Sequence, residues 1–277
     1  IHRVPGLARR SRAAEHALSS QQPAGQAGVM EATARVGSLL APRHSGMPQA
    51  VATSSSDGST PPIVRLCELL AAHTRTCADP AAPPPAVLSR EVCLLMDTLT
   101  CEDLGLTPAA WQAGRIMTHS VHEGAAFEVV VFLFPPRASI PLHDHPNMTV
   151  FSKVLCGSLA MRSFDWLQPL SADEYAALDR EQERLEALAE TGGYGGGGGG
   201  PTTAKSRAAR QRADTVLTPE APTFVLGPSF GNVHAFCATG RCAVLDVLLP
   251  PYDERGGRDC HYFAEEEKEE VAAEVEA

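Results

Sequence analysis

The sequence lacks any apolar run long enough to cross a membrane, and it lacks paired cysteines. Its longest apolar run, residues 129–134, is far shorter than the roughly 20 residues that a bilayer-spanning helix needs. The eight cysteines form no CxxC pair and show no regular spacing. Several of them lie in apolar, strand-like surroundings, which favours reduced intracellular thiols over a disulfide framework. We therefore expect no membrane partner.

A dominant basic patch is also missing. The net charge is −10, and residues 264–277 carry seven glutamates against one lysine, which gives this short tail a charge of −6. An acidic tail of this kind is typical of a solvated chain end. We therefore expect no nucleic-acid partner.

Large apolar residues are scarce in residues 1–62, which are rich in Ala, Ser, Gly and Pro. Such a segment cannot bury enough surface to offset its ordering entropy, so we expect a disordered or targeting region. Arginines near its start would suit an organelle transit peptide, but Glu15 and Pro5 weaken that interpretation. We expect one domain over residues 63–263, an acidic tail over 264–277, and a cytoplasmic protein, with the nucleus or an organelle as alternatives.

The apolar periodicity predicts a mainly β domain preceded by helices. Helical spacing occurs over residues 63–72 and 87–100, and from residue 116 the pattern changes to short β-branched and aromatic runs separated by Gly or Pro. Many short strands of this kind indicate a sandwich or barrel. Residues 148–155 and 159–166, separated by a Gly-Ser pair, predict a β-hairpin.

One segment interrupts the strand pattern. Residues 171–174 form a capping box that begins an apolar helical stripe, and six consecutive glycines follow at 195–200. We expect residues 171–214 to be a surface insertion with a helix and a flexible glycine run. A solvated decoration is favoured over a partner-binding helix.

Two histidines, His143 and His145, lie two residues apart in the sequence IPLHDHP at residues 140–146. On a strand this spacing places both imidazoles on one face, which suits a metal site inside a small barrel. Asp144 would point to the opposite face. HxH alone is a weak signal, because a strand histidine is more often a structural residue than a ligand.

A third ligand is needed, and the histidines near the expected strands are His119, His122, His234 and His261. His234 is the strongest candidate because it follows the sequence GNV on an apolar strand, where an unpartnered imidazole would be costly to bury. His143, His145 and His234 are therefore the predicted metal ligands.

Seven motifs, taken in their order along the chain, resemble those of one family, the plant cysteine oxidases and the 2-aminoethanethiol (cysteamine) dioxygenases. The resemblance extends over roughly residues 85–263 and is closer to the plant enzymes. The motifs lie at residues 140–146 (IPLHDHP), 148–155 (MTVFSKVL), 157–159 (GSL), 163–166 (SFDW), 231–234 (GNVH), 242–253 (CAVLDVLLPPYD) and 257–262 (GRDCHY).

The resemblance implies a cupin-type double-stranded β-helix barrel that holds Fe(II) through three histidines. It implies O2-dependent oxidation of a thiol to a sulfinic acid. In the plant branch the substrate is the N-terminal cysteine of a protein, whose oxidation leads to N-degron degradation and so to oxygen sensing. It also implies a monomer. Oxidation of cysteamine or free cysteine, a non-catalytic cupin, and Zn2+ at the same site are the alternatives.

Two further residues are expected in the pocket. Asp246 lies in an otherwise apolar strand, where a carboxylate needs a partner, and the resemblance places it near the substrate amine or an iron ligand; a structural ion pair is the alternative. Tyr252 matches a pocket tyrosine that would donate a hydrogen bond to bound oxygen, or it could anchor a loop. Cys260 and Tyr262 match a pair that can cross-link in the cysteamine branch, and we assign them no catalytic role.

Overall fold

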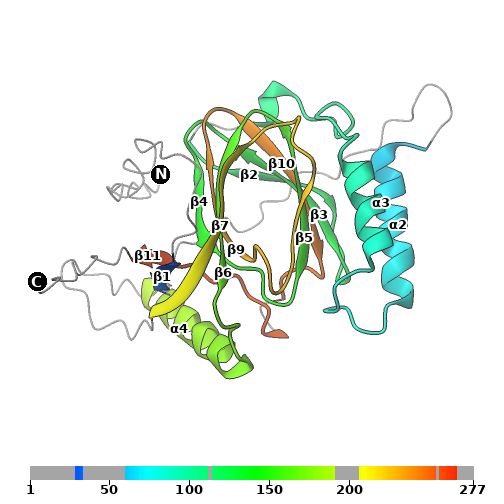
Figure 1. Cartoon of the computed structure of the whole chain (residues 1–277). Helices are drawn as coiled ribbons and strands as arrows, with labels where there is room; N and C mark the ends of the chain where they lie inside the picture. The colour runs from blue at the N-terminus through cyan, green and yellow to red at the C-terminus, as the bar shows by residue number, and fades with distance from the viewer. Residues whose placement is uncertain (1–28, 34–59, 112–113, 191–205, 254–255, 267–277) are drawn as a thin grey trace, which may run out of the picture.

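The computed structural model describes residues 29–33, 60–111, 114–190, 206–253 and 256–266. Two antiparallel sheets face each other, with helices outside them (Figure 1). The six-stranded sheet has the order β11-β1-β7-β6-β9-β4, and the five-stranded sheet has the order β2-β3-β10-β5-β8. The strands are β1 (Val29–Thr33), β2 (Met117–His122), β3 (Glu128–Phe134), β4 (Ser139–His143), β5 (Thr149–Cys156), β6 (Leu159–Trp166), β7 (Ser206–Leu217), β8 (Phe224–Leu226), β9 (Val233–Ala238), β10 (Cys242–Leu249) and β11 (Ala264–Glu266).

The winding of the chain confirms the predicted fold class. Strands β3 to β6 alternate between the two sheets, and so do strands β7 to β10. This alternation encloses a space between the sheets and is the winding of a double-stranded β-helix. The helices are α2 (Pro62–Thr76), α3 (Ala86–Met96), the short 3-10 helix η1 (Pro108–Ala110) and α4 (Ala172–Glu190). Among the described helices, none combines the length and apolar content needed to cross a bilayer.

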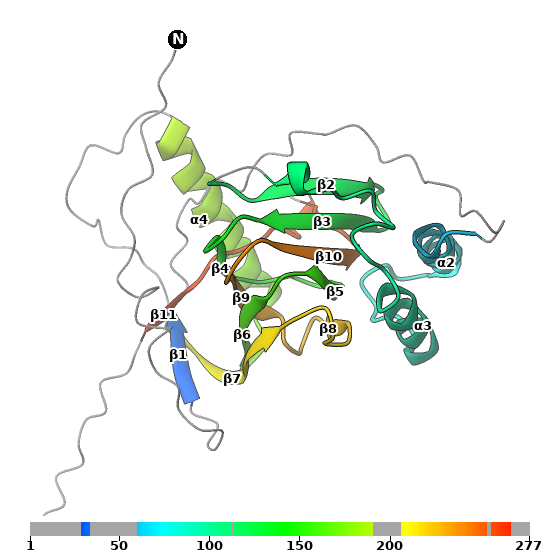
Figure 2. The ribbon, with the colours of Figure 1, turned by 90° about the horizontal axis from the view of Figure 1, so that it is seen from above.

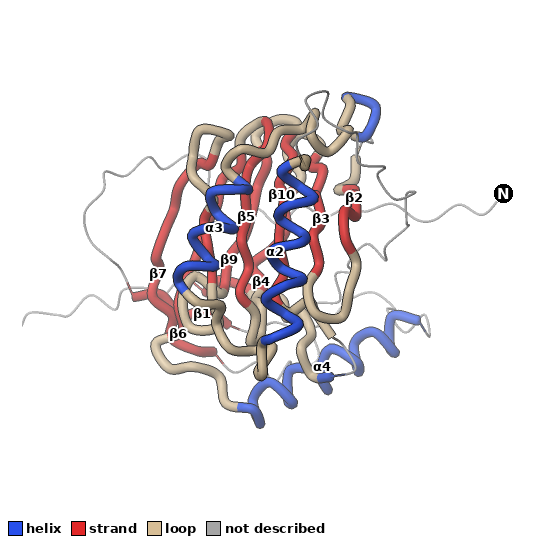
Figure 3. Tube along the Cα trace, turned by 90° about the vertical axis from the view of Figure 1, so that its right-hand side faces the viewer, coloured by secondary structure: helices blue, strands red, loops and turns tan. Residues whose placement is uncertain are grey.

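Helices α2 and α3 cover the outer face of the five-stranded sheet (Figure 3). Their apolar residues at helical spacing, such as Leu66, Leu70 and Val92, are fully buried in one apolar cluster with residues of β3, β5 and β10. Every residue of β10 is buried, because its other face lines the space between the sheets. This two-sided burial explains why β10 is an almost continuous apolar run with Asp246 as its one charged residue.

The predicted hairpin is wrong. Strands β5 and β6 follow each other closely, but β5 pairs with β10 and β8, whereas β6 pairs with β7 and β9. The chain therefore crosses from one sheet to the other at Gly157 and Ser158. Each of the two strands has an apolar face directed into the barrel. Placing these two faces opposite each other buries more apolar surface than pairing the strands side by side would.

The predicted insertion is also too long. Helix α4 is present, but residues 206–214 belong to β7, which pairs with β6 along its length. The glycine run at 195–200 lies outside the described residues. Two segments predicted to be unstructured contribute strands to the six-stranded sheet: β11 is its edge strand, and β1 pairs with both β11 and β7. Residues 1–28, 34–59 and 267–277 lie outside the described residues, so the predictions for them stay predictions, whereas Pro62, which was predicted to lie in the disordered region, begins α2.

The β5–β6 crossing generates a prediction about Gly157. Its φ of +79° lies in the left-handed region, and a Cβ added there would lie 2.1 Å from the carbonyl oxygen of Arg241. We expect Gly157→Ala to lower the free energy of unfolding by about 2 to 4 kcal/mol, from backbone strain and the clash together. Urea unfolding would measure this. Gly240→Ala is the control, since nothing lies within 4 Å of its added Cβ; equal losses in both variants would contradict the prediction.

Candidate metal centre

The structure brings His143, His145 and His234 together between the two sheets. His143 is the last residue of β4, and it lies opposite His234 of β9 in the strand register. His145 follows two residues later, beyond the end of β4. One ligand atom from each residue lies within 4.8 Å of the other two, and all three residues are buried. The His143 ring centroid lies 5.0 Å from that of His145 and 4.5 Å from that of His234.

Burial keeps the three imidazoles neutral. It lowers the pKa of His143, and it lowers the pKa values of His145 and His234 well below the usual range. The proximity of the rings lowers the last two further, because two adjacent positive charges repel. Neutral imidazole is the form that binds a metal.

Hydrogen bonds fix the ring of His145. The Tyr252 hydroxyl lies 2.8 Å from the Asp144 carbonyl oxygen and 2.6 Å from His145 Nδ1. A carbonyl can only accept, so the hydroxyl donates its proton to Asp144 and must accept one from His145 Nδ1–H. His145 Nε2 therefore carries the lone pair, and it is buried without a partner among the described residues.

The ring of His143 is fixed in the same way. Its Nδ1 lies 2.9 Å from the carbonyl oxygen of Pro141, so Nδ1 carries the proton and Nε2 the lone pair. In His234, Nδ1 is buried without a partner among the described residues. Three clustered, neutral imidazoles, two of which have a buried nitrogen without a partner in the described part of the chain, fit a divalent metal ion that prefers imidazole, such as iron or zinc.

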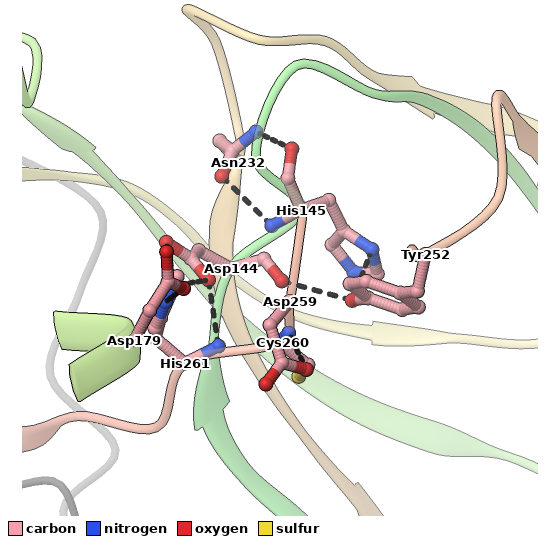
Figure 4. A network of polar contacts seen from close by, with 8 residues as sticks. All are labelled: Asp144, His145, Asp179, Asn232, Tyr252, Asp259, Cys260 and His261. Carbon is pink, nitrogen blue, oxygen red and sulfur yellow. Dashed lines mark hydrogen bonds and ion pairs between the residues drawn. The ribbon is translucent and has the colours of Figure 1, made fainter. Parts of the chain in front are cut away.

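Asn232 joins the loop that contains His145 to β9. Its side-chain oxygen accepts a hydrogen bond from the backbone N–H of His145 at 3.0 Å, and its Nδ2 donates to the carbonyl oxygen of His145 at 2.8 Å (Figure 4). This pair of bonds sets the position of His145 relative to His234, two residues further along β9. Asn232 was not predicted, although it stands within the GNVH motif.

Asp246 lies on the interior wall of the barrel. Alternation along β10 places it on the same face as Val244 and Leu248, which pack into clusters between the sheets. Burial, with a smaller contribution from Glu128, raises its pKa to about 7, although a hydrogen bond with Ser152 opposes the shift. Its Oδ1 has no hydrogen-bond partner in the described part of the chain. The structural ion pair considered as an alternative is not seen there.

The predicted oxygen-facing role of Tyr252 differs from its observed contacts. A hydroxyl has one proton, and that proton is directed at Asp144. Burial raises the pKa of Cys260 to about 12, although the neighbouring hydroxyls of Tyr252 and Tyr262 oppose this shift. Tyr252 therefore supports the His145 ring, and a role toward oxygen would require it to exchange the Asp144 contact.

A cleft of about 470 Å³ opens beside Tyr252, between the segment after β10 and the β2–β3 connection. Its walls include Asp253, Arg258 and Glu123. Tyr252 thus borders this cleft on one side and hydrogen-bonds to His145 on the other.

The comparisons with known proteins identify the family of the chain. The PCO_ADO family model matches residues 95–277. The chain is 32% identical to plant cysteine oxidase 1 of Arabidopsis thaliana over 183 residues, which cover 62% of this chain and 53% of that protein. It is 31% identical to the 2-aminoethanethiol dioxygenase of Homo sapiens over 177 residues, covering 61% of this chain and 62% of that protein. The chain thus spans about half the length of the plant relative.

Among solved structures, a cupin superfamily protein from Desulfitobacterium hafniense matches with 12% identity and a TM-score of 0.31, covering 53% of this chain and 91% of that one. An RmlC-like cupin protein from Desulfovibrio desulfuricans matches with 17% identity and a TM-score of 0.26, covering 50% and 87%.

The support of His145 by Tyr252 is testable through metal affinity. Tyr252→Phe removes the acceptor of His145 Nδ1–H, and we expect the affinity for Co(II) or Fe(II) to fall by about 10- to 100-fold. Competition with a chromophoric chelator would measure it. Tyr262→Phe is the matched control, because it removes a tyrosine hydroxyl that lies near Cys260 and has no hydrogen bond to a histidine among the described residues. Similar affinities for Tyr252→Phe and the wild type would contradict this role.

The raised pKa of Asp246 predicts how stability depends on pH. Between about pH 4 and pH 7 the folded metal-free protein holds a proton that the unfolded chain has released, so this group makes stability fall as pH rises. Above that window, Asp246→Asn should be more stable than the wild type by up to about 4 kcal/mol. Urea unfolding of both proteins from pH 4 to pH 8 would test this. A variant that is less stable than the wild type at pH 8 would instead indicate an ion-paired carboxylate.

Proposed function

The chain belongs to the PCO_ADO family, and from its three-histidine centre we propose that it is an Fe(II)-dependent thiol dioxygenase. The proposed reaction is R–SH + O2 → R–SO2H, in which both oxygen atoms enter the sulfur product. The observation that carries the proposal is the cluster of three buried, neutral imidazoles, two of which (His145 and His234) have a buried nitrogen without a partner among the described residues. The named relatives, a plant cysteine oxidase and a 2-aminoethanethiol dioxygenase, support thiol oxidation.

A bound Fe(II) would supply the redox chemistry with O2 and would lower the pKa of a thiol held beside it. A ligand set without a carboxylate leaves the full positive charge of the ion, which favours a thiolate. The residues of the protein orient the metal ligands and keep the site dry. Tyr252 and Pro141 hold the two rings of the HxH motif, and the apolar clusters around β9 and β10 exclude water.

Asp246 is our candidate for binding the amine of a 2-aminothiol. Its unpartnered oxygen lies on the interior wall, and its pKa of about 7 means that an ammonium group nearby would favour the charged carboxylate. The proton then stays on the substrate nitrogen, and the thiol is the group that loses its proton.

We propose the N-terminal cysteine of a protein as the substrate. The cleft beside Tyr252 supports this choice, because a polypeptide needs an open path beside the centre whereas a small thiol can react in a closed pocket. Oxidation of such a terminus would feed an N-degron pathway and make the protein an oxygen sensor of the cytoplasm. Cysteamine is the second candidate, since the human relative carries its name.

The experiment is reconstitution with Fe(II) without oxygen, followed by exposure to air with a short peptide that begins with Cys, or with cysteamine. We expect the peptide to gain about 32 Da, the mass of two oxygen atoms in a sulfinic acid. The same peptide with an acetylated N-terminus should react far less, because it cannot present an ammonium group to Asp246. Mass spectrometry of the product is the readout.

Two variants identify the third ligand. His234→Ala should abolish oxidation, and His119→Ala, which removes a histidine of β2 outside the cluster, should retain it. Oxidation of cysteamine but not of the peptide would indicate that the substrate is a small thiol. No oxidation of either substrate by an iron-loaded protein would refute the dioxygenase assignment.

A further inference from the structure

A second histidine site lies next to the metal centre and links it to helix α4. His261 is fully buried, with Asp144 on one side of its ring and Asp179 on the other (Figure 4). Its Nδ1 lies 3.1 Å from Asp144 Oδ1, and its Nε2 lies 2.9 Å from Asp179 Oδ1. Asp144 is the residue between His143 and His145, and Asp179 belongs to α4.

The ring of His261 is held as an imidazolium. A carboxylate accepts at each ring nitrogen, so both nitrogens must carry a proton to make both bonds. Burial alone would lower the pKa of His261, but the hydrogen bond and charge of Asp144, and then those of Asp179, outweigh it and raise the pKa to about 9. Loss of either carboxylate would leave a buried ring nitrogen without an acceptor.

Asp144 is fixed by His261 from several directions. The backbone N–H of His261 donates to Asp144 Oδ1 at 2.9 Å, and the backbone N–H of Asp144 donates to the carbonyl oxygen of His261 at 3.1 Å. The ring adds its own bond to the same carboxylate. The short segment that separates the two predicted ligands is therefore positioned by His261.

Helix α4 contacts the barrel on a small surface. Leu178 packs against the apolar cluster on the outer face of the six-stranded sheet, and Glu174 forms an ion pair with Arg207 of β7. The ring of Tyr175 lies 5.7 Å from that of His261. Figures 1 and 2 show α4 on the opposite side of the strands from α2 and α3. Of these contacts, Asp179 is the one that reaches the ring bonded to Asp144.

We propose that Asp179 and His261 are positioning residues for the metal centre: through them, docked helix α4 fixes Asp144 and with it the spacing of His143 and His145. Docking of α4 and metal affinity are then linked, and the linkage is reciprocal, so a bound metal must stabilise the docked helix by the same factor. The inference rests only on the metal-binding part of the proposed function and is independent of the substrate.

Asp179→Asn tests the linkage in the full-length protein. It keeps the shape of the side chain but removes the charge that holds the second proton of His261. We expect the affinity for Co(II), followed by its absorption spectrum during titration, to fall by about tenfold. Asp179→Glu restores a carboxylate and should recover most of that affinity.

Asp173→Asn is the matched control, since Asp173 is an exposed aspartate in the first turn of the same helix. It should change the affinity by less than about twofold, which separates loss of the Asp179 contact from general weakening of α4.

Hydrogen exchange supplies a readout that does not depend on activity. Adding Co(II) to the wild type should slow amide exchange in α4, and this slowing should be lost in Asp179→Asn. Unchanged affinity in Asp179→Asn, or α4 exchange that is indifferent to Co(II) in the wild type, would overturn the inference. A wild-type protein that binds no Co(II) would overturn the proposed metal centre itself, so the two failures are distinguishable.

Discussion

The structure depends on burying three imidazoles so close together that one nitrogen of each lies within 4.8 Å of the others. Each ring loses water on burial, and a buried nitrogen without a partner is costly. The protein holds the arrangement by satisfying the other side of the HxH rings, with the carbonyl oxygen of Pro141 for His143 and the hydroxyl of Tyr252 for His145. The remaining cost is that of the buried nitrogens without a partner among the described residues, His145 Nε2 and His234 Nδ1, and a metal ion bound by this cluster would lower it. The strand register that sets His143 opposite His234 is therefore tied to metal binding.

Local patterns predicted the elements well and their pairing less well. The helices over 63–72 and 87–100 were found because their apolar stripes reflect burial of one face, and the structure places α2 and α3 there. The β5–β6 pair was assigned to a hairpin because a short Gly-containing connection is the usual signal for one. In this barrel both strands bury side chains in the interior. Whether β5 and β6 pair in one sheet or lie opposite each other in two sheets depends on the pairing of all the other strands. The short connection could not reveal that choice.

The same difference between local patterns and long-range contacts applies to the residues of the metal centre. The spacing of the HxH motif and the cost of an unpartnered imidazole in an apolar strand were readable in the sequence, and they selected the three residues that the structure brings together. Asn232 and Asp144 were visible only as polar residues near a ligand. Their partners lie 87 and 117 residues away in the chain, so the contacts exist only once the loops have crossed. Asp179 was missed for another reason: an amphipathic helix beside a glycine run resembles a solvated decoration.

The two helix layers illustrate how apolar and charged contacts differ in what they contribute. Helices α2 and α3 bury a continuous apolar surface against the five-stranded sheet, and such burial stabilises in proportion to its area without fixing any one atom. Besides the contacts of Leu178 and Glu174, helix α4 reaches the barrel through a part-buried carboxylate–imidazolium contact, whose desolvation cost offsets much of its attraction. A contact of that kind adds little net stability, but its directional bonds specify a geometry. It is therefore suited to the place where it occurs, one residue away from two metal ligands whose separation has to be fixed.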